Sequence, residues 1–220
     1  MPRTIVLTVG GTQVYGYNSN SVLAFKSGLS IDADGSPHAY HPLPQPGLDY
    51  LANAGEPGNW WALVTDNGLS SGNPIIQGPN DPAPGYYVST TSLEDGTKQA
   101  SDPTRYVDSE TIPFVALPPS IRTYFKKGDI GYAYNQANNV HSYFIFADIG
   151  PGNHIGEGSI QLAINLGINS SPKHGGTDGN VVYVLFAGSG DGNVKTADEI
   201  NVIGDSFYGN VDMTSILADF

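Results

Sequence analysis

The sequence contains no cysteine. This absence excludes disulfide bonds, zinc sites built on thiolates and cysteine nucleophiles. Positive charge is scarce as well, with 9 Lys and Arg against 21 Asp and Glu and a formal net charge of −12. So acidic a chain is not expected to bind nucleic acid. The charge serves either solubility or the attraction of a cationic substrate.

Long apolar runs are also missing. The N-terminal segment MPRTIVLTVGG has no apolar stretch of signal-peptide length, and no segment approaches the roughly 20 apolar residues that cross a membrane. The motifs G-x-S-x-G, G-x-x-x-x-G-K-[ST] and H-E-x-x-H do not occur. The sequence therefore predicts no membrane span, and it lacks the signatures of several common enzyme classes.

Metal-binding patterns are weak. Of the five His residues only His38 and His41 lie close together, and no third ligand accompanies them. The segment DADGS, residues 32–36, begins like a calcium loop, but Leu43 stands at the twelfth position, where a carboxylate is needed. We expect a turn here, with sugar contact as the functional alternative, and no metal site.

Glycine, proline and tyrosine are abundant, with 28, 16 and 13 residues, which favours short strands and many turns over long helices. Two strands joined at Gly10-Gly11 are expected first. Further strands are expected at 22–27, 60–65, 74–77, 85–93, 130–135, 142–147 and 181–186. Long polar loops are expected at 32–59 and 94–111, and the first is long enough to suggest a functional role.

Two segments favour short helices. Ser159 is a candidate N-cap for apolar residues at helical spacing, and Gly167 is the expected stop. Thr196 and Glu199 form a capping-box pattern. The coarse expectation is a mainly β domain over residues 1–220 with two or three short helices.

One stretch, FADIGPGNHIGEGSI, places two acids on either side of a Gly-Pro-Gly turn. Asp148 is expected at a strand end, and Glu157 stands between two glycines that free its backbone. Different surroundings can separate the pKa values of two carboxyls, which suits an acid–base pair. The alternative is structural: Glu157 caps the helix near Ser159, and Asp148 binds N–H groups of the turn.

Aromatic and polar residues in the loops suit a carbohydrate, because flat rings stack on sugar faces. In an adjacent pair on a strand, such as Trp60-Trp61, one ring points inward, so at least half of these rings belong to the core. The substrate-binding candidates from these segments are Asp32, Asp34, Tyr40, Asp49, Trp60, Asp66, Tyr87 and Thr91.

Six ordered blocks resemble the chitosanases of glycoside hydrolase family 75. They are DADGSPHAYHP, GLDYLANAG, NWWALVTDNG, PAPGYYVSTTSL, RYVDSETIPFVALP and FADIGPGNHIGEGSIQLA, and they span about residues 32–186. The resemblance implies endo-acting hydrolysis of β-1,4-linked glucosamine with inversion. It implies Glu157 as general acid and Asp148 as general base, and the pairing is firmer than the division of roles. It also implies a secreted protein, although no leader is seen here.

A more distant resemblance concerns the fold. A strand ending in Asp, then Gly-Pro, a short loop, an acid and a Ser before a helix is similar to the core of double-psi β-barrels. The expectation is therefore a six-stranded double-psi-type barrel with long loops. A peptidoglycan-active enzyme and an expansin-like polysaccharide-binding protein remain as alternatives on the same barrel.

The expected partner is chitosan or its oligosaccharides, whose protonated amines suit the negative charge. No cofactor, nucleic acid or membrane partner is expected, and the protein is expected to be a monomer.

Overall fold

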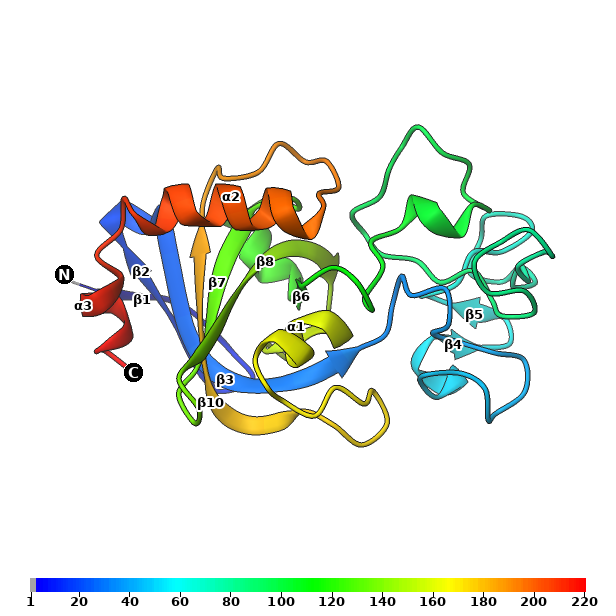
Figure 1. Ribbon diagram of the computed structural model, residues 1–220, viewed down its shortest axis with the longest axis horizontal. Helices are drawn as coiled ribbons and strands as arrows, with labels where there is room; N and C mark the ends of the chain where they lie inside the picture. Colours follow the sequence, from blue (N-terminus) through cyan, green and yellow to red (C-terminus); the bar gives the residue numbers. More distant parts are fainter. Residues whose placement is uncertain (1–2) are drawn as a thin grey trace.

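A computed structural model describes residues 3–220. Its central feature is a closed β-barrel (Figure 1). The strands, in order around the barrel, are β3 (Val22–Asp32), β10 (Thr177–Phe186), β7 (Ile130–Asn135), β8 (Val140–Ile149), β6 (Phe114–Leu117) and β9 (Glu157–Ser159). Pairing of β9 with β3 closes the ring. The six-stranded barrel expected from the sequence is therefore confirmed.

The barrel mixes parallel and antiparallel pairs. β6 with β8 and β3 with β9 are parallel, and the other neighbours are antiparallel. Two further strands, β1 (Thr4–Val9) and β2 (Thr12–Tyr17), extend the sheet from β3 as a hairpin. Its turn is Gly10-Gly11, as predicted, and both glycines have positive φ, 52° and 89°. Residues other than glycine rarely adopt these φ angles.

Side chains fill both faces of the barrel wall. The inner cluster includes Phe25, Phe144, Phe146 and Tyr183, and α1 (Ile160–Asn165) adds Leu162 to it. On the outer face lie α2 (Ala197–Tyr208) and α3 (Met213–Leu217) (Figure 1), and their residues Ile200 and Ile216 belong to the apolar cluster on that face. The count of three short helices agrees with the expectation. None of the helices described in residues 3–220 has the length and hydropathy needed to span a membrane.

Residues 33–113 leave the barrel after β3 and form a separate mass of loops on one side of it (Figure 1). Their only strands are β4 (Gly55–Glu56) and β5 (Asn59–Trp60) among the described residues. The strands predicted at 60–65, 74–77 and 85–93 are wrong as continuous elements. Isolated bridges stand in their place, between Leu63 and Ser89, Thr65 and Pro74, and Ile76 and Tyr87.

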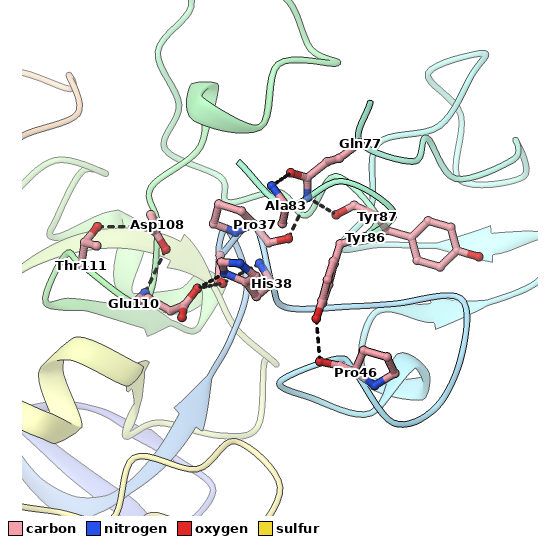
Figure 2. A network of polar contacts seen from close by, with 11 residues as sticks. Pro37, His38, Pro46, Gln77, Ala83, Tyr86, Tyr87, Asp108, Glu110 and Thr111 are labelled. Carbon is pink, nitrogen blue, oxygen red and sulfur yellow. Dashed lines mark hydrogen bonds and ion pairs between the residues drawn. The ribbon is translucent and has the colours of Figure 1, made fainter. Parts of the chain in front are cut away.

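Polar contacts tie these loops together, and Figure 2 shows one network. The buried Gln77 side chain donates to the carbonyl oxygens of Pro37 (2.7 Å) and Tyr87 (3.1 Å), and its oxygen accepts from the Ala83 N–H (3.0 Å). His38 Nδ1 lies 2.9 Å from Glu110 Oε2 in the same view. Segments far apart in the sequence are thereby held in one arrangement.

Ser159 joins the barrel to α1. Its fully buried Oγ accepts from the N–H groups of Leu162 (3.1 Å) and Phe114 (2.9 Å) and donates to the Ile112 carbonyl (2.8 Å). The predicted N-cap is therefore confirmed, and the same oxygen also fixes the start of β6. Because β9 carries Glu157 and β6 lies between Glu157 and Asp148, this hydroxyl supports the strands that hold these acids.

We predict that Ser159→Ala lowers the free energy of unfolding by about 3 kcal/mol, since it removes the cap and leaves buried backbone groups unpaired. Urea unfolding measures this change. Thr196→Ala is the matched control, because Thr196 caps α2 in an exposed capping box and should cost only about 1 kcal/mol. Equal losses in the two variants would contradict the buried role of Ser159.

Candidate active site

A one-residue bulge aims Asp148. Phe144 and Phe146 of β8 point into the barrel, so strict alternation would also point Asp148 inward. The pairing with β6 shifts at this point: Phe146 lies opposite Val115, but Asp148, not Ala147, lies opposite Ala116. Such a shift turns every following side chain to the other face, and bulges often re-aim side chains in this way. Asp148 therefore leaves the apolar interior.

Glu157 reaches the same face from the other side of β6. It also lies opposite Ala116, so the two acids flank this small residue across neighbouring strand pairs. The glycines around it have defined roles. Gly156 has φ +102°, and a Cβ on Gly150 would lie 2.7 Å from Glu157 Oε2. Gly150, in the turn after Asp148, thus leaves room for the Glu157 carboxyl.

The two acids lie in a cleft of about 810 Å³ formed by the barrel rim and the loop region. Six acidic residues line it: Asp32, Asp34, Asp49, Asp148, Glu157 and Asp178. Of the described residues that line it, none is Lys, Arg or His. Trp61, with 60% of its surface exposed, adds an aromatic face, and its Nε1 donates to the Asn53 carbonyl (2.9 Å). The cleft therefore combines concentrated negative charge with a fixed aromatic ring.

Three donors converge on one oxygen of Asp148. Oδ1 accepts from Ser92 Oγ (2.6 Å), the Ser92 N–H (2.8 Å) and the Ile149 N–H (2.8 Å). Burial has the largest effect and raises the pKa of Asp148 above its ordinary value, and these hydrogen bonds and the nearby charge of Lys127 offset part of that rise. The structural alternative for Asp148 is thus present, since it does bind N–H groups. Those bonds also stabilise the ionised form of a buried carboxylate.

Glu157 has a different environment. Within residues 3–220 no hydrogen bond to its carboxylate is found, and the helix cap that it was considered for belongs to Ser159. Burial raises the pKa of Glu157 to about 7, with further contributions from the charges of Asp148 and Asp49. Near neutral pH a large share of Glu157 is therefore protonated. Both pKa values are raised by burial, but only Asp148 has hydrogen bonds and a nearby cation that offset part of this effect.

Asp32 and Asp34 adjoin this pair. One carboxylate oxygen of each lies within 4.8 Å of the other and of an Asp148 oxygen. Burial is the main cause that raises the pKa of both well above the usual range, and neighbouring carboxylates add to it. Tyr40 donates to Asp34 Oδ1 (2.7 Å), and the Asp34 N–H donates to Asp32 Oδ1 (2.7 Å). DADGS is thus a turn, as expected.

Oxygens at this spacing are compatible with a hard cation and with an ammonium group alike. An acidic cluster does not by itself identify a metal site, because close carboxyls can instead share protons. The expectation that the protein uses no metal stays a prediction.

The other substrate-binding candidates divide into two groups. Tyr40 and Asp49 line the cleft beside Asp32 and Asp34. Four candidates lie elsewhere: Trp60, Asp66, Tyr87 and Thr91.

Each of these four has another environment. Trp60 is 8% exposed and packs in the core of the loop region, where Tyr87 also packs. Asp66 is exposed and accepts from Asn73. Thr91 is buried and donates to the Leu93 carbonyl.

The ring of the tryptophan pair that lines the cleft is Trp61. The alternation rule predicted one inward ring but could not say which. Ser92 is not among the residues predicted from the sequence, and its contact with Asp148 spans 56 positions of sequence. No local sequence pattern predicts such a contact.

No protein-family model matches the chain. No curated protein matches it either. The chitosanase resemblance therefore stays a prediction, and the chemistry of the site carries the functional assignment.

The raised pKa of Glu157 predicts a pH-dependent stability. The folded-state pKa, about 7, lies above the ordinary value of 4.5, so between these values the folded state holds a proton that the unfolded state has lost. The contribution of this proton to the stability of the folded state is fully present below pH 4.5 and is lost as the pH rises through 7. We predict that the free energy of unfolding of Glu157→Gln, relative to that of the wild type, rises by about 3 kcal/mol between pH 4.5 and pH 8.

Urea unfolding of both proteins at the two pH values measures the difference. Glu56→Gln, at an exposed position on β4, is the control and should follow the wild type at both pH values. An unchanged difference between wild type and Glu157→Gln would contradict a buried, protonated Glu157.

Proposed function

We propose that the protein is an endo-acting chitosanase that hydrolyses β-1,4 linkages between glucosamine units with inversion. The observation that carries this proposal is the Asp148–Glu157 pair. The two acids flank Ala116 on one face of the barrel, in an acidic cleft, and only Asp148 has hydrogen bonds that stabilise its ionised form. Secretion accompanies the proposal, since chitosan is an extracellular polymer. The proposal also includes action as a monomer.

The two roles follow from the environments. Glu157, with a pKa of about 7, holds the proton that the leaving glycosidic oxygen needs. Asp148, whose ionised form is stabilised by three donors on Oδ1, takes a proton from the attacking water. The water oxygen bonds to the anomeric carbon as the glycosidic C–O bond breaks. Attack from the opposite face inverts the configuration.

The spacing of the strands supports inversion. Asp148 and Glu157 lie on strands either side of β6, so two strand spacings, about 10 Å, separate their backbones. Side chains at paired positions stand on the same face and roughly parallel. Carboxyls about 6.5–9.5 Å apart leave room for a water, whereas a covalent mechanism needs about 5–5.5 Å. The register favours the wider separation.

The charges of the cleft support a cationic sugar. Asp32 and Asp34 are buried beside other acids, and an ammonium group between them would offset the burial and repulsion that raise their pKa values. At longer range the net charge of −12 attracts a polycation, and this attraction weakens with salt. Trp61 offers a flat face on which a sugar ring can stack.

We predict that Asp148→Asn and Glu157→Gln each lower kcat on chitosan by about a hundredfold or more, since each removes one proton-transfer group. Reducing-end release measures the loss, and both variants should still bind chitosan. Proton NMR of early products should show the α anomer first. Activity above a few per cent in either variant, or a β anomer, would overturn the assignment.

The alternatives differ in their substrates. A peptidoglycan-active enzyme would release sugar from cell walls with weak salt dependence, and an expansin-like protein would bind polysaccharide without creating reducing ends. The same assay on chitosan, chitin, cell walls and carboxymethylcellulose distinguishes the three.

The acidic cluster predicts substrate preference. Asp34→Asn should lower the ratio of kcat/KM on glucosamine oligomers to that on partly acetylated ones by about tenfold, as loss of one ammonium contact. Asparagine keeps an acceptor for Tyr40, so the turn should persist. Asp66→Asn is the matched control, because Asp66 lies outside the cleft.

These assays contain EDTA, which keeps divalent cations out of the cluster. If the ratio is unchanged in Asp34→Asn, or falls equally in Asp66→Asn, this role of the cluster is refuted. Loss of all activity in EDTA would instead overturn the expectation that no metal is needed.

A further inference from the structure

The segment that carries Ser92 is anchored directly on the bulge of β8. The Leu93 N–H donates to the carbonyl of Ala147 (2.7 Å), the residue that the shifted register leaves unpaired with β6. Ser92 then donates twice to Asp148, through its N–H and its hydroxyl, and both bonds end on Oδ1. One short segment thus holds both the bulge and the side chain that the bulge re-aims.

A cation supports the segment from behind. Lys127 Nζ donates to the Ser92 carbonyl. The chain beside Lys127 is itself fixed to β8, since the Gly128 N–H donates to the Phe146 carbonyl (2.9 Å). The positive charge therefore lies near Asp148 without lining the cleft, where it would repel a cationic substrate.

The bonds are unevenly divided between the two oxygens. Oδ1 has three donors, and no donor to Oδ2 is found within residues 3–220. Oδ2 is thus the atom available to a water in the cleft. A carboxylate with one saturated oxygen cannot rotate without losing three hydrogen bonds, two of them from the backbone.

We propose that Ser92 is a positioning residue that, with Lys127 behind it, fixes Asp148 with Oδ2 toward the attacking water and stabilises its ionised form. The inference rests on the proposed function only in naming the glycosidic bond as the bond that the water attacks. The hydrogen bonds themselves do not depend on the reaction. Ser92 touches no reacting atom, so its effect passes entirely through Asp148.

The other charged groups that face Asp148 oppose this effect. Asp32 and Asp34 approach it from the end of β3 and the turn that follows, and Glu157 approaches from β9. β6 contributes Ala116, which does not titrate. Lys127 is the cation that lowers the pKa of Asp148. Ser92 and Lys127 therefore counter the repulsion from three carboxyls.

The test is Ser92→Ala, which removes the 2.6 Å hydroxyl bond and keeps both backbone donors. Its acidic limb of kcat/KM should move up by about one pH unit, a tenfold change in proton affinity. At pH values below that limb, kcat should fall about tenfold, with KM changed less than twofold. Lys127→Met should move the limb in the same direction by a smaller amount.

Ser92→Thr keeps the hydroxyl and should restore the wild-type profile. Ser92 is half-buried and borders a hollow at the surface, so the added methyl group has room. Thr97→Ala is the matched control. Thr97 also donates from its N–H (3.0 Å) and its hydroxyl (2.6 Å) to one carboxylate oxygen, that of Asp95, on an exposed loop. Its pH profile should match the wild type.

A second measurement separates the two hypotheses. Carbon-13 NMR titration of the Asp148 carboxyl should show the same upward shift in Ser92→Ala without any substrate. If the wild type hydrolyses chitosan but the NMR shift and the pH limb are both unchanged, the role of Ser92 is refuted and the function stands. If the NMR shift appears but the wild type releases no reducing ends, the positioning stands and the function fails.

Discussion

One extra residue in β8 governs the chemistry of this protein. Without the bulge at Ala147, Asp148 would continue the inward row of Phe144 and Phe146 and would lie in an apolar interior that cannot hold its charge. With the bulge, Asp148 stands beside Ala116 on the same face as Glu157. The bulge has its own hydrogen-bond partner, the Leu93 N–H, so its freed carbonyl is not left unpaired. The register shift in β8 therefore determines on which face of the barrel wall Asp148 lies.

Crowding is the second constraint that follows. Acids gathered at one rim repel one another, and burial makes each charge more costly. Asp148 and Glu157 differ in the neighbours that offset this cost. Asp148 receives donors on Oδ1 and a nearby cation, whereas Glu157 receives neither and retains its proton up to about pH 7. The difference between two residues of the same chemical type therefore comes from neighbours, not from the side chains themselves.

Local signals in the sequence were sufficient for elements whose geometry depends on neighbouring residues. The glycine pair of the first hairpin, the Ser159 cap and the Thr196 capping box belong to this group, because each is decided within about four positions of chain. The expected strands at 60–65 and 74–77 failed for the opposite reason. Their backbones bond to distant loops, and only isolated bridges form. Apolar, β-branched residues favour extended chain but do not supply a partner strand.

For the site as well, local sequence signals could identify individual residues but not the contacts that depend on the fold. Asp148 and Glu157 could be singled out because glycines and a strand end surround them, but their shared face depends on a bulge that alternation cannot reveal. Trp60 and Trp61 illustrate the same gap, since a reversal of faces exchanges which ring is buried. Ser92 could not be singled out at all, because its meaning comes from a fold-dependent contact.

The cleft divides its functions between two parts of the fold. The barrel supplies Asp148 and Glu157 through strand register, while the loops supply Asp34, Asp49 and Trp61. Buried polar contacts such as those of Gln77 fix the loops, which have only a small apolar core of their own. A change in the loops away from Ser92 and Leu93 can therefore alter the lining of the cleft while the register of β6, β8 and β9 stays intact. Under the proposed function, the barrel carries the two acids, and the loops together with the end of β3 carry the side chains proposed to contact substrate.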